Sequence, residues 1–286
     1  MDFLGSELAD DERDASALFH ILPVPLEKTV SYGAGTAKGP EAIIAASQEL
    51  ERICPGPDGY EEPCRLGIKT HAAMDCEAEI AEVMRKLRHR TRVIAHAGHI
   101  PVTLGGEHSL TYGAAMGVMD ALRKPIGLVQ IDAHADLRVA YGGEPHSHAS
   151  VMHLLAGEGV RIAQYGVRAL CREELAMREE RGVLAQDGLA LARGEAAMAL
   201  PDDFPREVYV SFDVDGLDPS VMPATGTPVP GGLGFEEALG ILETVLAGRR
   251  IVGIDVVELA PTPALAFCDF TAAQLAYRLM ALAAAR

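Results

Sequence analysis

Residues 128–138 read LVQIDAHADLR, an apolar run that turns abruptly polar. The apolar part, residues 126–131, has the composition of a buried strand. Asp132, His134 and Asp136 follow at alternate positions, so an extended chain directs all three side chains to one side. Buried polar groups are costly unless they have partners or bind a metal. The stretch therefore predicts a core strand that ends in a ligand-binding site.

Around this stretch, apolar strand-like segments alternate with amphipathic helical segments, which is typical of βαβ units and a mostly parallel sheet covered on both faces. We expect residues 1–17 to be a lead-in, residues 18–286 to form one catalytic α/β domain, and residues 53–70 to be an irregular loop. A glycine-rich loop at 32–39 precedes a helix that begins near Pro40. The predicted strands are 19–25, 100–106, 126–132, 161–168, 206–215 and 251–259, and the later predicted helices are 77–97, 109–123, 147–158, 171–182, 234–250 and 269–285.

Composition excludes several classes of protein. The chain has 286 residues, of which 49% are hydrophobic, and a formal charge of -16. This charge repels nucleic acid and anionic membrane surfaces and favours cationic ligands. No apolar run is long enough to span a membrane, and the acidic N-terminus does not resemble a targeting signal. The five cysteines are odd in number and form no C-x-x-C pair, so we expect reduced thiols and a cytoplasmic protein.

Further polar residues stand at the ends of three other predicted strands: His108, Asp213 with Asp215, and Glu258. The carboxyl ends of parallel strands meet at one edge of a sheet, where open α/β folds bind their ligands. We therefore expect these residues to converge with those of the 128–138 stretch, although they are distant in sequence.

The expected cluster contains two imidazoles and four aspartates. Four carboxylates in one pocket raise one another's pKa unless positive charge compensates them, and two divalent cations would supply that charge. Carboxylate oxygens with some imidazole suit Mn²⁺, although Zn²⁺, Co²⁺ and Fe²⁺ also bind such donors.

Simpler interpretations exist for the single motifs. GGEHS, residues 105–109, is also typical of a strand-to-helix turn capped by Ser109. DVDGLDP, residues 213–219, has the acidic alternation of a calcium loop. That loop needs Gly at position six and Glu at position twelve, where this chain has Asp218 and Ala224. The calcium interpretation therefore fails.

Four segments together resemble the metal-binding motifs of the ureohydrolases, the arginase and agmatinase family: LGGEHSL (104–110), QIDAHADLR (130–138), SFDVDGLDPS (211–220) and VVELAP (256–261). The similarity extends over nearly the whole chain. It implies an arginase-like, three-layer α/β/α fold and two Mn²⁺ ions per chain. The family's GGDHS is GGEHS here, with Glu107 at a position that does not bind metal.

The resemblance also implies roles for single residues. It assigns His108 and Asp136 to one metal, His134 and Asp215 to the other, and Asp132 and Asp213 to both. Asp136 would also transfer a proton from the attacking water to the leaving amine. Glu258 would bind the substrate's guanidinium. His148 would be the proton shuttle, with His146 and His153 as competitors nearby in sequence.

The sequence says less about the part of the substrate beyond the guanidinium group, its tail, than about the guanidinium itself. Arginases bind the α-carboxylate partly with an Asn two residues after the last metal-binding Asp of this motif, and here that residue is Arg138. The ADLR, SHAS and ATGTPVPGGL segments look most like those of agmatinases, which favours agmatine. Arg138 could instead bind a carboxylate, as in guanidinobutyrate, or pair with Glu144. Aminopropylagmatine and arginine remain alternative substrates.

The family resemblance implies a homo-oligomer, a trimer or a hexamer, acting on a small cationic guanidino compound. Deacetylases share the architecture but use one metal ion. The second D-x-D pair, Asp213 and Asp215, supplies ligands that a mononuclear site does not need.

Overall fold

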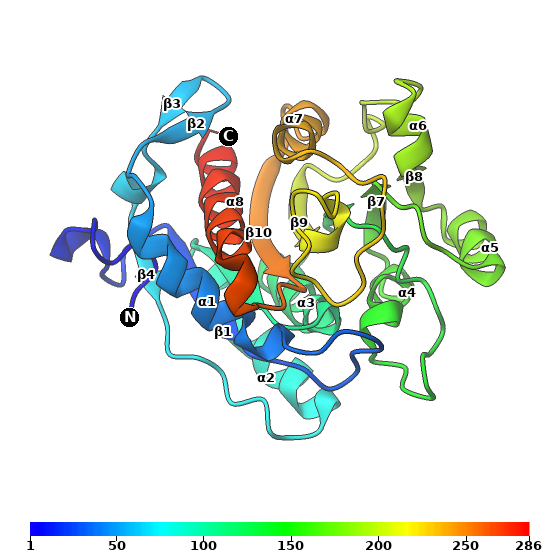
Figure 1. Cartoon of the computed structure of the whole chain (residues 1–286), viewed down its shortest axis with the longest axis horizontal. Helices are drawn as coiled ribbons and strands as arrows, with labels where there is room; N and C mark the ends of the chain where they lie inside the picture. The colour runs from blue at the N-terminus through cyan, green and yellow to red at the C-terminus, as the bar shows by residue number, and fades with distance from the viewer. Residues whose placement is uncertain (286) are drawn as a thin grey trace.

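The computed structural model describes residues 1–285, and a parallel sheet runs through its centre (Figure 1). Within these residues the main sheet has eight strands, and each neighbouring pair is parallel. In spatial order the strands are β4 (Ile68–Thr70), β1 (Phe19–Val24), β5 (Ile100–Gly105), β10 (Arg250–Val257), β9 (Glu207–Asp213), β6 (Gly127–Ile131), β7 (Arg161–Tyr165) and β8 (Leu184–Gln186).

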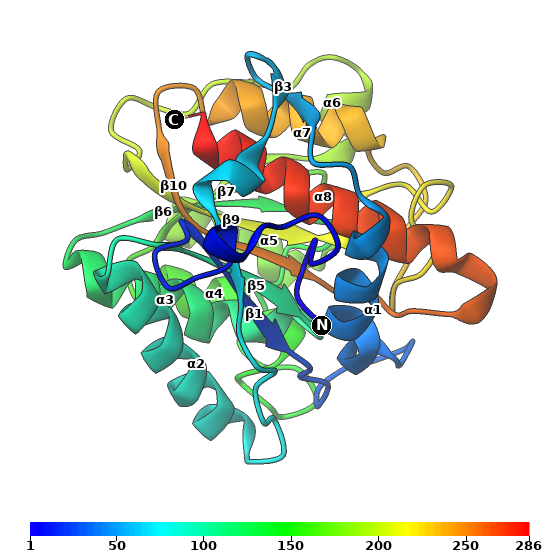
Figure 2. The ribbon, with the colours of Figure 1, turned by 90° about the vertical axis from the view of Figure 1, so that its left-hand side faces the viewer.

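Helices cover both faces of this sheet (Figure 2). One face carries α2 (Ile80–His96), α3 (Thr111–Leu122), α4 (Val151–Gly157) and α5 (Arg172–Arg181). The other carries α1 (Gly39–Ala46), α7 (Phe235–Val245) and α8 (Ala266–Ala284). Each helical layer packs on the sheet through its own cluster of buried apolar side chains. The predicted three-layer α/β/α fold is confirmed.

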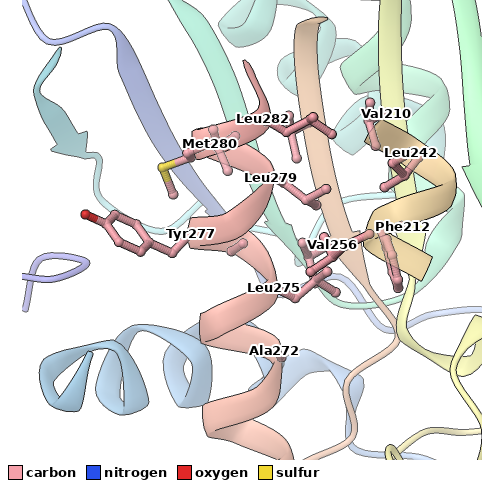
Figure 3. Packing of buried hydrophobic residues seen from close by; sticks show 14 of the residues in the cluster. Val210, Phe212, Leu242, Val256, Ala272, Leu275, Tyr277, Leu279, Met280 and Leu282 are labelled. Atoms are coloured by element: carbon pink, nitrogen blue, oxygen red, sulfur yellow. The ribbon is translucent and has the colours of Figure 1, made fainter. Parts of the chain in front are cut away.

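Helix α8 shows why these layers hold together. Leu275 and Leu279 are fully buried and point from the helix toward β10 and β9 (Figure 3). They lie beside Val256 and Phe212, which are also fully buried. Burying one such side chain contributes about 1.5–3 kcal/mol. Packing of the apolar strand faces on the helices therefore fixes the sheet relative to the helical layers. It also fixes the positions of the strand ends.

The segment 53–70 differs from the expected irregular loop. It forms an antiparallel hairpin of β2 (Cys54–Gly56) and β3 (Gly59–Glu61), a 3-10 turn (Pro63–Leu66), and the edge strand β4. The short strand β8 and helix α6 (Gly188–Ala192) were also not predicted. Strands of three residues are too short to show a hydrophobic period, so only their pairing partners reveal them.

The lead-in segment 1–17 packs against the body of the protein. Phe3 and Leu4 are fully buried, and their backbone amides donate to Thr70 Oγ1 and Ser47 Oγ, both at 2.9 Å. The Phe3 ring lies 6.4 Å from the ring of Tyr277 in α8. The segment therefore contributes apolar surface to the core and polar contacts to the edge of the sheet.

Two further expectations concern the whole chain. All five cysteines carry free thiols, as predicted. Among residues 1–285, no helix combines the length and the apolar composition needed to cross a membrane.

Candidate metal centre

Four strands that are neighbours in the sheet deliver the polar residues of the site. They are β5, β10, β9 and β6, in that spatial order. His108 follows β5, Glu258 follows β10, Asp213 ends β9, and Asp132 follows β6. The carboxyl ends of parallel strands meet at one edge, so residues up to 150 positions apart line one cavity. The convergence expected from the sequence is present.

The first group of possible metal ligands surrounds His108. Its Nδ1 atom lies 3.1 Å from Asp132 Oδ2, 3.0 Å from Asp136 Oδ2 and 3.3 Å from Asp213 Oδ2. His108 and these three aspartates are almost completely buried. His108, Asp132 and Asp136 present ligand atoms close enough together to hold one ion.

A second group surrounds His134. Its Nδ1 atom lies 3.0 Å from Asp215 Oδ2 and 3.6 Å from Asp132 Oδ1. Asp132, His134 and Asp215 again form a set that could hold one ion. Thr227, from the TGTPVPGG segment, donates to Asp215 Oδ2 at 3.3 Å. Asp132 belongs to both groups, with Oδ2 toward His108 and Oδ1 toward His134, so it is placed to bind two ions at once.

The hydrogen bonds of His108 test whether a cation fits between these side chains. Ser211 Oγ donates to Asp255 Oδ1 at 2.8 Å, so the same hydroxyl accepts from His108 Nε2 at 2.8 Å. Nδ1 is therefore the ring nitrogen that faces the three carboxylates. Burial disfavours a charged His108, but contacts with Asp132, Asp136 and Asp213 outweigh it and raise its pKa well above the usual value, so this point attracts positive charge, as a proton or as a cation bound to the neutral imidazole. This buried Nδ1 has no hydrogen-bond partner. The nitrogen of the neutral imidazole and the carboxylate oxygens around this point all carry lone pairs. Such an arrangement suits a metal ion, which these lone pairs can coordinate.

The electrostatics of the cluster lead to the same conclusion. Burial and the charge of Asp132 raise the pKa of Asp136 to about 7, and burial and the charge of Asp215 raise that of Asp213 well above its usual value. Burial disfavours a charged His134, but bonds to Asp132 and Asp215 outweigh it and raise its pKa to about 12. The carboxylates therefore need positive charge among them, and divalent cations would provide it.

Two site residues have an unusual backbone conformation. Asp136 has φ 53° and Glu258 has φ 66°, in the left-handed region that residues other than glycine seldom adopt. The carbonyl of Asp136 accepts from the amides of Met152 and His153 at 3.0 and 3.2 Å, which holds this turn. Such conformations cost on the order of 1–3 kcal/mol and often occur at functional sites.

Glu258 lies next to His108. Its Oε1 atom accepts from the backbone N–H of His108 at 2.6 Å, and the side chain lines the cavity while remaining 8% exposed. Burial raises the pKa of Glu258 to about 8. A cationic group that enters the cavity would lower this pKa again and pair with the ionised carboxylate, one oxygen of which is already held by the His108 amide.

Of the three candidate shuttle histidines, His148 lines the cavity, in a 3-10 turn (His148–Ser150) before α4. His146 instead contacts Glu144, with its amide 2.8 Å from Oε1. The amide of His153 donates to a backbone carbonyl near the site, and its Nδ1 atom is buried without a hydrogen-bond partner. Burial lowers the pKa of His148, which favours the neutral imidazole.

Sequence reasoning missed the residues that orient His148. Thr29 Oγ1 donates to Glu107 Oε1 at 3.0 Å and lies 3.1 Å from His148 Nδ1. A carboxylate only accepts, so the single hydroxyl proton of Thr29 goes to Glu107, and His148 Nδ1 must donate to Thr29. The Nε2 atom of His148 is then the proton acceptor. Glu107 in place of Asp in the GGEHS motif was the available signal, because its carboxylate also holds the amides of Lys28 and Thr29, each at 2.6 Å.

Arg138 lines the same cavity but does not pair with Glu144. Its guanidinium carbon lies 5.4 Å from the centre of the Tyr141 ring, and its amide donates to the carbonyl of Ala149 at 3.0 Å. Glu144 contacts His146 instead. The expected alternative of an Arg138–Glu144 ion pair is therefore not formed.

Comparisons with known proteins place this site in a family. The model of the arginase family matches residues 17–282. The chain is 36% identical to an N(1)-aminopropylagmatine ureohydrolase of Thermus thermophilus over 95% of this chain and 93% of the relative. It is 32% identical to an agmatinase of Pyrococcus horikoshii over 96% and 94%.

Among solved structures, the agmatine ureohydrolase of Thermoplasma volcanium superposes with a TM-score of 0.84 and 28% identity, covering 99% of this chain and 94% of the other. Both the sequence match and the fold extend over almost the full length. The chain therefore belongs to the arginase family and is a ureohydrolase that acts on guanidino C–N bonds.

Proposed function

We propose that this chain hydrolyses agmatine to putrescine and urea at a centre of two Mn²⁺ ions. The observation that carries the proposal is that Asp132 is shared by two groups of possible metal ligands, whose other members line one cavity together with Glu258. The second candidate substrate is N1-aminopropylagmatine, which is favoured by the names of four relatives that are 33–37% identical to the chain.

In this proposal each ion is held by one histidine and by aspartates. His108 and Asp136 would hold one ion, His134 and Asp215 would hold the other, and Asp132 and Asp213 would supply oxygens to both. The unpartnered Nδ1 atom of His108 and the hard carboxylate oxygens support this assignment and favour Mn²⁺. When bound, divalent ions make water nucleophilic near neutral pH.

The chain's own residues then bind the substrate and move protons. Glu258 pairs with the guanidinium, because a buried carboxylate and a planar cation form strong charge-assisted hydrogen bonds. Asp136 takes a proton from the attacking water and gives it to the leaving amine. The amine departs as an ammonium ion and needs a second proton, which His148 relays from solvent through Nε2, because Thr29 fixes Nδ1 as a donor. The water's remaining proton returns to solvent as urea forms.

A substrate panel tests this proposal. Urea release is measured with agmatine, N1-aminopropylagmatine, 4-guanidinobutyrate and arginine, and metal per chain is measured by elemental analysis. We expect two Mn²⁺ per chain and a kcat/KM for agmatine at least about 100-fold above that for arginine, a difference of roughly 3 kcal/mol in transition-state binding. A higher value for N1-aminopropylagmatine would select the second candidate. Fast arginine turnover, or one metal per chain, would contradict the proposal.

His148→Asn is expected to lower kcat by about 10²–10³-fold with little change in KM, because the variant loses a proton acceptor but no substrate contact. His146→Asn is the matched control, since His146 lies two residues away and does not line the cavity. Steady-state kinetics on both variants check the prediction. Equal losses in both would show that the segment matters only for structure.

A further inference from the structure

A row of five buried polar side chains crosses the sheet beneath the proposed metal centre. All five are completely inaccessible to solvent. They are in register on adjacent strands, Asp255 opposite Thr103 and Ser211, and Gln130 opposite Ser211 and Gln164. Side chains alternate along a strand, so Asp132, two residues after Gln130, follows on the same side of the sheet. Five buried polar groups in one row would be costly without mutual hydrogen bonds.

One half of the row ends on the shared ligand Asp132. Gln130 Nε2 donates to Asp132 Oδ2 at 2.6 Å. Gln164 Nε2 donates to Gln130 Oε1 at 2.7 Å and also to the carbonyl of Ala135 at 2.7 Å. Ala135 lies between His134 and Asp136, so Gln164 also contacts the loop that carries both of these residues.

The direction of these hydrogen bonds is determined by groups outside the row. Arg178 Nε lies 3.0 Å from Gln164 Oε1, and a guanidinium can only donate. The carbonyl of Ala135 can only accept, so both neighbours require the same orientation of the Gln164 amide. Gln164 must then donate to Gln130, and Gln130 must donate to Asp132.

Arg178 is itself held in place. Its side chain is 8% exposed, and Nη1 lies 2.9 Å and 3.1 Å from the two carboxylate oxygens of Asp187. The Nη2 atom of Arg178 is buried and has no hydrogen-bond partner. A desolvated guanidinium is seldom kept without a specific use, and the hydrogen bond to Gln164 provides one.

We propose that Arg178, Gln164 and Gln130 form a positioning relay that holds Asp132 as a hydrogen-bond acceptor, with one oxygen turned toward each group of metal ligands. This inference rests on the proposed metal centre. A carboxyl group that rotated could not present one oxygen to each group of metal ligands. The relay opposes this rotation, because the Gln130 amide donates to Oδ2.

The relay predicts weaker metal binding when the direction of its hydrogen bonds is changed without a change of shape. Gln164→Glu keeps the length of the side chain and still accepts from Arg178, but it has no N–H to donate to Gln130. Mn²⁺ affinity, measured by titrating the metal-free variant, is expected to fall by about 10–100-fold, the usual effect of losing a partner of a metal ligand. Thr103→Val is the control, because Thr103 shares the row but its oxygen has no hydrogen-bond partner. Its Mn²⁺ affinity should remain within about threefold of that of the wild type.

Gln130→Met removes the donor to Asp132 directly and is expected to weaken Mn²⁺ binding to a similar extent. The double variant, Gln164→Glu with Gln130→Met, should lose less Mn²⁺ affinity than the product of the two single losses. Both changes interrupt the same chain of hydrogen bonds to Asp132. Unchanged affinity in Gln164→Glu, or fully multiplicative losses, would overturn the relay. If Gln164→Glu does not fold, Gln130→Met decides alone, and wild-type affinity in it overturns the proposal. Failure of the wild-type chain to bind two ions would instead refute the proposed function.

Discussion

Asp132→Asn is expected to abolish urea release and to lower the metal content of the chain. Both oxygens of Asp132 accept N–H groups, Oδ2 from Gln130 and Oδ1 from the amide of His134, each at 2.6 Å. An asparagine must turn its own NH₂ toward one of them, so the variant loses a charge and gains a donor–donor clash. Disrupting a buried charge cluster costs roughly 3–5 kcal/mol, which corresponds to about 10³-fold in kcat/KM.

The measurement combines urea release with elemental analysis of metal per chain. Asp120→Asn is the matched control, because Asp120 forms a partly exposed ion pair with Arg88 at 2.7 Å and lies outside the cavity. The control should keep full activity and its metal. An Asp132→Asn protein with normal turnover and two ions per chain would exclude the shared-ligand assignment.

Glu258→Gln is expected to lower kcat/KM by about 10²–10³-fold while metal binding stays intact. The amide oxygen of glutamine can still accept from the amide of His108, now at 2.6 Å from Oε1, so the backbone contact survives. The negative charge that would pair with a guanidinium is lost, and charged hydrogen bonds at such sites account for roughly 2–5 kcal/mol.

Kinetics with agmatine and a Mn²⁺ titration of the same variant check this result. Retained Mn²⁺ affinity with a large kinetic loss would support a substrate-binding role. A variant that loses its metal instead would show that Glu258 acts by holding His108. A variant that keeps full kcat/KM would exclude a role for Glu258 in substrate binding.

Much of the fold could be predicted because its central elements are long and regular. The strands that became β1, β5, β6, β7, β9 and β10 each carry enough apolar residues to show their character in sequence. The edges could not be predicted. The three-residue strands β4 and β8 depend on pairing with a longer neighbour, and the segment 1–17 is held by contacts such as that of Phe3 with Tyr277.

The candidate site divides in the same way. The alternation of polar residues in LVQIDAHADLR and the D-x-D pair at 213–215 indicated the candidate metal ligands, because the geometry of a strand end is local. The pairing of Arg138 with Tyr141 rather than Glu144 was not readable, since both partners are near in sequence and only the path of the loop separates them.

By itself, then, the sequence determined which residues stand at strand ends and therefore the chemistry that could gather at one edge of the sheet. The tertiary structure alone decided how those residues are held. Thr29 meets His148 across 119 positions, and Gln130, Gln164 and Ser211 meet through the register of adjacent strands. The direction of each hydrogen bond depends on whether a donor or an acceptor lies opposite the side chain on the adjacent strand. The order of the strands in the sheet determines this partner, and no single segment of the chain encodes that order.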